Sequence, residues 1–192
     1  MTRYLKIFLT LIRQNLSVEM SFRKNFIMKV FTQILFVVLQ IAVVQVYFRF
    51  TNQIGSWSKF EVFTLVGIFR LIEGSFHMFF HSNLLTLPET INLGELDGLL
   101  IKPINTLFLT SLQRFQLDEV STFVSGLVIL TFSLPSSNLL TISQVGILTI
   151  LGLIAIYSIM LFFSSWSFRF NRLTAISSIW DAISRTCRYP LD

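Results

Sequence analysis

Four long apolar stretches alternate with short polar segments along the 192-residue chain, at residues 26–48, 60–80, 115–134 and 145–168. A helix rises about 1.5 Å per residue, so about 20 apolar residues cross the roughly 30 Å hydrocarbon core of a bilayer. The third stretch is strongly apolar only from Val120, so its helix is expected to begin near Phe115. The pattern predicts an all-α fold, a polytopic transmembrane helical bundle that forms a single domain over residues 1–192.

The residues before the first span follow a helical period instead. Apolar side chains recur three or four positions apart and basic side chains lie on other faces; the apolar set is Leu5, Phe8, Leu9, Ile12 and Leu16. This spacing predicts an amphipathic helix that lies in the membrane interface. An amphipathic helix packed on neighbouring spans is the alternative.

Composition supports a membrane protein and excludes several functions. Hydrophobic residues make up 53% of the chain and charged residues 13%, whereas soluble domains carry about 25% charged residues. Cys187 is the only cysteine, so neither an internal disulfide nor a cysteine-based metal cluster can form. The sequence contains no Gly-Lys pair, so it lacks the P-loop through which many proteins bind and hydrolyse ATP.

The distribution of basic residues predicts the orientation in the membrane. Thirteen of them lie outside the interior of the spans, and a cytoplasmic N-terminus puts eleven inside: Arg3, Lys6, Arg13, Arg23, Lys24, Lys102, Arg114, Arg169, Arg172, Arg185 and Arg188. Only Arg49 and Lys59 then lie outside, as the positive-inside rule requires. The net charge of +5 therefore serves topology, and no nucleic-acid partner is expected.

A short polar segment, residues 84–108, separates the second and third spans and reads LLTLPETINLGELDGLLIKPINTLF. Thr86 can cap a helical turn that contains Pro88, Gly94 can end that turn, and Pro103 prevents a helix from continuing through Lys102. We call this predicted cytoplasmic segment the elbow. It carries acidic residues beside an apolar strip: Glu89, Glu95 and Asp97 beside Leu96, Leu99, Leu100 and Ile101. Such a surface is typical of a docking site for another protein.

Polar residues within the spans are the next candidates. Arg70 and Glu73 lie three residues apart in the second span, where they can neutralise each other and either lock helices together or line a polar path. Locking is the favoured interpretation. Gln33, Gln40 and Gln45 lie in the first span and can make interhelical hydrogen bonds or line a translocation path. We expect interhelical bonds for at least two of the three.

Two further constellations have alternative interpretations. Glu73, His77 and His81 follow at intervals of four, so they share a helix face and can ligate a metal, unless Glu73 pairs with Arg70 and the histidines only mark the interface. Arg114 and Asp118 have the spacing of an ion pair on a solvated helix that extends into the cytoplasm.

Residues 173–192 have helical apolar spacing and end shortly after Pro190. This pattern is expected of an amphipathic segment that leads into a fifth span. We therefore expect the chain to be truncated at its C-terminus or to be a fragment.

Three strings carry a family resemblance: IGSWSKFEVFTLVG at 54–67, INLGELDGLLIKPINTLF at 91–108 and RYP at 188–190. They resemble the ABC-2 type permease family, more narrowly the bacterial six-span permeases with a G-x-LD-x-LL-x-(K/R)-P loop. The matching positions are Gly94, Leu96, Asp97, Leu99, Leu100, Lys102 and Pro103. The resemblance covers almost the whole chain, which ends near the start of the family's fifth span.

The resemblance implies a permease subunit of an ABC exporter in the bacterial cell membrane. It implies that the elbow is a coupling helix that docks on a separate ATP-binding subunit, and that a second permease, identical or paired, completes the pathway. ATP and magnesium would be bound by the partner, with no cofactor, metal or catalytic residue in this chain. The coupling candidates are Glu95, Leu96, Asp97, Leu99, Leu100, Lys102 and Pro103; the intramembrane polar candidates are Gln33, Gln40, Arg70 and Glu73. A non-transporting structural remnant and a membrane-embedded metal-dependent enzyme are the alternatives.

Overall fold

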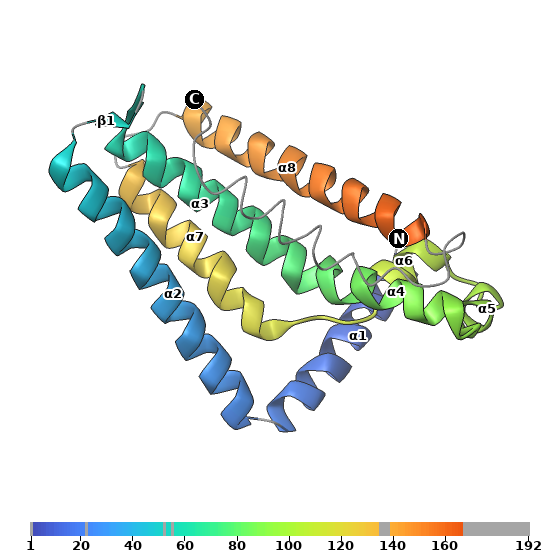
Figure 1. Ribbon diagram of the computed structural model, residues 1–192. Coiled ribbons are helices and arrows are strands. Elements are labelled where there is room, and N and C mark those ends of the chain that lie inside the picture. The colour runs from blue at the N-terminus through green and yellow to red at the C-terminus, as the bar shows by residue number, and fades with distance from the viewer. Residues whose placement is uncertain (1, 22, 52, 55, 135–138, 167–192) are drawn as a thin grey trace.

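The computed structural model describes residues 2–21, 23–51, 53–54, 56–134 and 139–166, and its long helices lie side by side as a bundle (Figure 1). The long helices are α2 (Arg23–Phe50), α3 (Lys59–Phe76), α7 (Val120–Ser133) and α8 (Leu139–Ser165). Within the described residues, three helices are long and apolar enough to cross a membrane, and a bent helix pair allows a fourth crossing. The prediction of a polytopic helical membrane protein is confirmed.

The second crossing is longer than the sequence predicted. α3 continues without interruption through a π-helical turn, η1 (His77–His81), into α4 (Ser82–Asn92). The whole helix spans 34 residues, Lys59–Asn92. It begins with a capping box, in which the Ser58 backbone N–H donates to Glu61 Oε2 at 2.7 Å and Ser58 Oγ accepts the N–H of Glu61. This capping fixes the start of α3 at Lys59.

The predicted helix start at Thr86 is wrong. Thr86 lies inside α4, and its hydroxyl donates to the carbonyl of Ser82 one turn earlier at 3.1 Å. Pro88 also lies inside α4, where it removes one backbone donor without ending the helix. Thr86 therefore bonds within the helix, and the helix reaches the elbow from the membrane side as one piece.

The elbow turns where the sequence predicted. α4 is followed by Gly94 with φ of 73°, a left-handed conformation that glycine adopts without strain. The short helix α5 (Glu95–Leu100) ends before Pro103, and α6 (Thr106–Leu112) then begins with the Asn105 side chain accepting the Phe108 N–H at 3.3 Å. The elbow thus comprises the end of the long helix, α4, followed by the short helices α5 and α6, with a tight turn before each.

The third crossing is broken. α6 is bent by 68° relative to residues 117–133, which comprise the 3-10 turn η2 (Leu117–Glu119) and α7. The α-helix therefore begins at Val120 and not near Phe115 as predicted. The physical reason is that the backbone of Arg114 and Gln116 bonds to α4 and η1 instead of to a helix of its own.

α3 occupies the centre of the bundle and packs most closely on α7. A Cβ atom added to Gly74 would lie 2.6 Å from the backbone nitrogen of Phe123 in α7, and one added to Gly126 would lie 2.9 Å from that of Leu71. Such distances require glycine, because no side-chain movement can relieve a clash with backbone. Small residues thus bring the backbones of α3 and α7 into direct contact.

Two apolar clusters attach the outer helices to this central pair. One joins α2, α3 and α7 through Val44, Val62, Val66 and Ile129. The other joins α3, α4 and α8 through Phe76, Leu84, Ile156 and Met160. A hairpin of two-residue strands, β1 (Gln53–Ile54) and β2 (Trp57–Ser58), links α2 to α3 at the end opposite the elbow. We call the two ends of the bundle the elbow end and the hairpin end.

The N-terminal helix α1 (Thr2–Ser21) crosses the elbow end at an angle to the bundle (Figure 1). The Tyr4 ring lies 5.3 Å from that of Phe108, and Asn15 Nδ2 donates to the carbonyl of Gln113 at 3.0 Å. Leu5 and Leu9 remain more than half exposed. α1 therefore packs on its neighbours, as in the alternative interpretation, and its position in the membrane interface stays a prediction. Residues 173–192, the predicted amphipathic tail, lie outside the described residues.

Candidate functional site

Arg70 and Glu73 form a buried ion pair in α3, the first part of the second crossing. Arg70 Nη1 lies 3.0 Å from Glu73 Oε2, and both residues are less than 10% exposed. Arg70 Nε also donates to Gln40 Oε1 of α2 at 2.8 Å. The two charges therefore compensate each other within α3, and the guanidinium ties α3 to α2. This geometry matches the locking interpretation.

Two of the three span glutamines make interhelical hydrogen bonds, as expected. Gln40 accepts from Arg70, and Gln33 Nε2 donates to Thr122 Oγ1 of α7. Thr122 is fully buried, and its hydroxyl donates a hydrogen bond to Glu119 Oε2 at 2.8 Å. Gln45 is exposed. The polar face of α2 is thus used to bind α3 and α7.

The histidine pair does not assemble with Glu73. The rings of His77 and His81 stack at 4.1 Å, and His77 Nδ1 lies 3.5 Å from Glu119 Oε1, while Glu73 turns to Arg70. Among the described residues, no group of three or more His, Cys, Asp or Glu side chains has the geometry of a metal site. The arrangement agrees with the alternative in which Glu73 serves the ion pair.

The predicted Arg114–Asp118 pair on a solvated helix is wrong. Residues 114–116 are not helical, and Asp118 Oδ2 instead pairs with Lys29 Nζ of α2 at 3.0 Å. The Asp118 side chain is only 12% exposed. The cause is again the break in the third crossing, which turns Asp118 toward α2, where both residues line a cavity of about 560 Å³.

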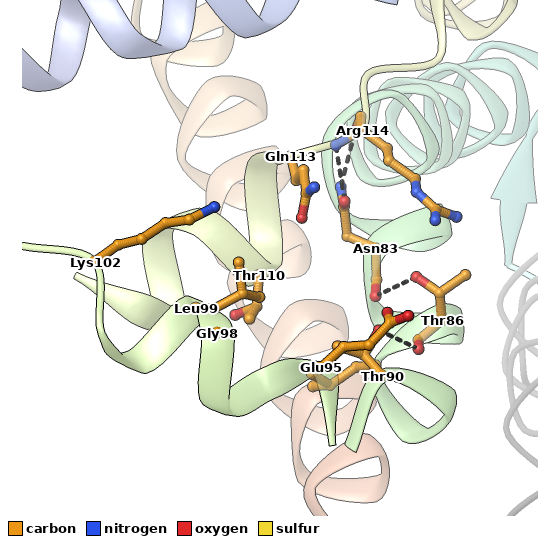
Figure 2. Close-up of a pocket in the computed structure, with 11 residues that line it drawn as sticks. Asn83, Thr86, Thr90, Glu95, Gly98, Leu99, Lys102, Thr110, Gln113 and Arg114 are labelled. Atoms are coloured by element: carbon orange, nitrogen blue, oxygen red, sulfur yellow. Dashed lines mark hydrogen bonds between the residues drawn. The ribbon is translucent and has the colours of Figure 1, made fainter. Parts of the chain in front are cut away.

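A second cavity, of about 310 Å³, lies within the elbow (Figure 2). The side chains in Figure 2 come from α4, α5, α6 and the turns that follow them, and Leu99 and Lys102 of the coupling candidates line the cavity together with Glu95. Leu96 is also half-buried. Three of the coupling candidates, Glu95, Leu99 and Lys102, therefore line the cavity, and a fourth, Leu96, is partly covered by neighbouring residues.

Other large apolar side chains of the elbow are open to the outside. Leu100 is 59% exposed and Ile101 is 85% exposed, and Leu93 is also exposed. Asp97 and Pro103 are exposed on the same segment. We call Leu93, Asp97, Leu100 and Ile101 the elbow tip. It combines one carboxylate with a strip of large apolar side chains, which is a surface suited to protein contact.

Sequence reasoning missed a polar junction beneath the elbow. Asn83, Ser111, Tyr157 and Ser164 make buried or half-buried hydrogen bonds between α4, α6 and α8. A clue was present in the sequence, because Pro88 leaves the carbonyl of Leu84, four residues earlier, without its helical donor. An apolar helix with such a carbonyl needs a polar partner from a neighbouring helix.

These features define a polytopic helical membrane protein in which an exposed elbow joins the second crossing to a broken third. A family model described as ABC-2 family transporter protein matches residues 24–192. The chain belongs to this family and is a membrane component of an ABC transporter. Comparisons with curated proteins and with solved structures found no match.

Proposed function

We propose that this chain is the permease subunit of an ABC exporter and that its elbow couples ATP hydrolysis by a separate subunit to movement of the crossings. The observation that supports this proposal best is the elbow tip, which exposes Leu100, Ile101 and Asp97 on a helix joined to two crossings. Family membership supports an ATP-binding partner, since the family comprises ABC transporter membrane components.

The proposal requires the elbow end to face the cytoplasm of a bacterial cell. The positive-inside rule supports this orientation, because Lys102 and Arg114 lie at the elbow end, together with the basic helix α1, whereas Arg49 and Lys59 flank the hairpin. Accessibility of introduced cysteines tests it in a Cys187→Ser background. A membrane-impermeant maleimide applied to intact cells should label Ser56→Cys in the hairpin and not Asp97→Cys. The reverse labelling would contradict the orientation.

In the proposed complex, Leu100 and Ile101 fill an apolar groove of the ATPase, and Asp97 meets a basic group at its rim. The apolar pair supplies buried area, whereas the carboxylate contributes more to partner choice and association rate than to affinity. Leu99, Lys102 and Glu95 line the cavity behind α5, so in this proposal they hold the elbow in shape. Pro103 limits the length of α5.

A second permease, identical or paired, would complete the pathway. α2 and α8 expose large apolar side chains along their length, so these helices offer surfaces both to lipid and to another permease. The transported substrate passes between the two permeases in this proposal. Four polar side chains would keep α2, α3 and α7 together during the movement: Gln33, Gln40, Arg70 and Glu73.

The test combines Asp97→Lys with Leu100→Ala and measures co-purification of the ATPase and hydrolysis coupled to transport. Both should fall strongly, while the amount of permease in the membrane stays unchanged, because both side chains are exposed. The matched control is Phe132→Ala, an apolar side chain at the hairpin end of α7 that is 77% exposed. Unchanged co-purification and coupled hydrolysis in the elbow variant would show that the elbow is not the coupling element.

A further inference from the structure

Asn83 is a buried amide in the first turn of α4, directly after the π-helical turn, and is only 5% exposed. Its Nδ2 group donates to the carbonyls of Ser111 at 3.0 Å and Arg114 at 2.8 Å, as well as to Phe79 in its own helix. Its Oδ1 accepts the backbone N–H of Arg114 at 2.8 Å (Figure 2). One side chain thus satisfies both the backbone N–H and the backbone carbonyl of Arg114.

The bonds of Asn83 fall on the break between α6 and η2. Backbone groups at a helix end have no partners within the helix and must find them elsewhere. Beside Asn83, the carbonyl of Met78 in the π-helical turn accepts the Gln116 N–H at 3.1 Å. The break is therefore bonded at two points to the single helix that runs from α3 to α4, and π-helical turns of this kind are frequent at functional sites.

α8 is attached to the same place. Pro88 deprives the carbonyl of Leu84 of its helical donor, and the buried hydroxyl of Ser164 in α8 donates to that carbonyl at 3.0 Å. Ser111 Oγ and Tyr157 Oη lie 2.8 Å apart, which joins α6 to α8. The junction beneath the elbow thus connects three crossings through named hydrogen bonds.

We propose that Asn83 is a positioning residue that makes the two arms of the elbow, α4 and α6, move as one body, so that a displacement of the elbow reaches α3 and α7 together. The proposal rests on the coupling function proposed above. Without Asn83, the break between α6 and α7 would act as a hinge, because the bend of 68° interrupts the helix there. A push on the elbow would then move α3 through the unbroken helix and would leave α7 behind.

The first test follows backbone hydrogen exchange of the full chain in lipid nanodiscs. Asn83→Ala should speed exchange at the Arg114 amide about tenfold, because it removes the side-chain acceptor of that N–H, whereas the Gln116 amide keeps its bond to Met78 and should change less. The matched control is Thr86→Val, on the same helix and beside the same cavity, whose hydroxyl bonds only within α4. Equal exchange in wild type and Asn83→Ala would overturn the proposed attachment. If Asn83→Ala does not fold, Asn83→Leu serves instead, since its side chain has a similar volume and offers no acceptor to the Arg114 N–H.

The second test distinguishes positioning from simple stabilisation. Spin-label pairs at Leu140 with Phe60 and at Leu140 with Phe132 report the hairpin ends of α3 and α7 against α8; all three sites are exposed. In the complex with its ATPase, trapping with magnesium, ATP and vanadate should shift both distances in wild type. In Asn83→Ala, the shift to Phe60 should persist, while that to Phe132 should lose more than half of its size.

The outcomes separate the two proposals. If wild type shows no shift at either pair on trapping, the coupling function of the elbow fails. If wild type shows both shifts and Asn83→Ala shows them equally, the coupling function stands and the role of Asn83 is refuted. Thr86→Val should behave as wild type in both pairs.

Discussion

α2 and α3 are both apolar enough to cross a membrane, yet they occupy opposite environments. The most apolar 18 residues have a mean hydropathy of 2.2 in α2 and of 1.4 in the helix Lys59–Asn92, which begins with α3. Of these residues, 0% are buried in the first helix and 56% in the second. The less hydrophobic helix is therefore the one at the centre. In a bilayer, lipid covers apolar side chains as well as protein does, so hydropathy alone does not bury a helix.

What places α3 at the centre is its small and polar residues. Gly74 lets the backbone of α7 approach, and Arg70 bonds to Gln40 of α2 as well as to Glu73 in its own helix. α2 contacts the other helices through Gln33 and Gln40, which meet α7 and α3. The comparison teaches that the position of a crossing in this bundle is determined by its non-apolar residues.

The largest effect is expected from unpairing the buried charges of α3. Arg70→Ala or Glu73→Ala should each lower the free energy of unfolding by about 3–5 kcal/mol, because one uncompensated charge remains buried. The double variant should lose much less than the sum of the two single losses. Steric-trapping measurements of unfolding in bicelles provide the values. Additive losses would mean that the two charges do not stabilise each other.

A pair of phenylalanines tests the comparison directly. Phe76 of α3 is fully buried, whereas Phe36 of α2 is 56% exposed. Phe76→Ala should cost about 2–3 kcal/mol, below the usual range for a water-soluble core, because lipid can replace part of the apolar contact but cannot fill the cavity. Phe36→Ala should cost close to nothing in the same unfolding assay. Equal costs would break the distinction between the two helices.

Close packing gives the next effect. Gly74→Leu should destabilise the bundle by about 1–3 kcal/mol, because the new side chain meets the backbone of α7. Gly146→Leu is the matched control in α8, since nothing lies within 4 Å of a Cβ atom added there. Thermal melting of the detergent-solubilised protein, followed by size-exclusion chromatography, is sufficient to rank the two. A tolerated leucine at Gly74 would show that α3 and α7 are not in backbone contact.

The smallest effect concerns the polar face of α2. Gln33→Leu removes the hydrogen bond to Thr122 and should cost about 0.6 kcal/mol, the average for such bonds between membrane helices. Gln45→Leu, an exposed glutamine of the same helix, is the control. A larger loss for Gln45→Leu than for Gln33→Leu would contradict the assignment of the bonded face.

Much of this fold was readable from the sequence, and the failures have two causes. Apolar length located the crossings, and the backbone preferences of glycine and proline located Gly94 and the end of α5. Thr86 was misassigned because one helix runs through it from Lys59 to Asn92. Phe115 and the Arg114–Asp118 pair were misassigned because local patterns assumed that each helix segment satisfies its own backbone. Asn83, Met78 and Ser164 satisfy it across the bundle instead, and such long-range bonds leave no periodic trace in a sequence.

The candidate site shows the same division. The spacing of three residues along one helix correctly predicted that Arg70 pairs with Glu73. That Glu73 pairs with Arg70 and not with the histidines was one of the two alternatives given by the sequence. The inward turn of Leu99 was not predictable, because the cavity that it lines is formed by α4 and α6 together. The coupling role of the elbow stays a prediction.

Site-specific photocrosslinking tests that role most directly. A benzoylphenylalanine at Leu100 in the full chain, expressed with its ATPase, should crosslink to the ATPase on illumination, and one at Phe60 near the hairpin end should not. Both positions are about 60% exposed, so access to the photoprobe is matched. A crosslink from Leu100 alone is the predicted result. A crosslink from Phe60 and none from Leu100 would contradict the account.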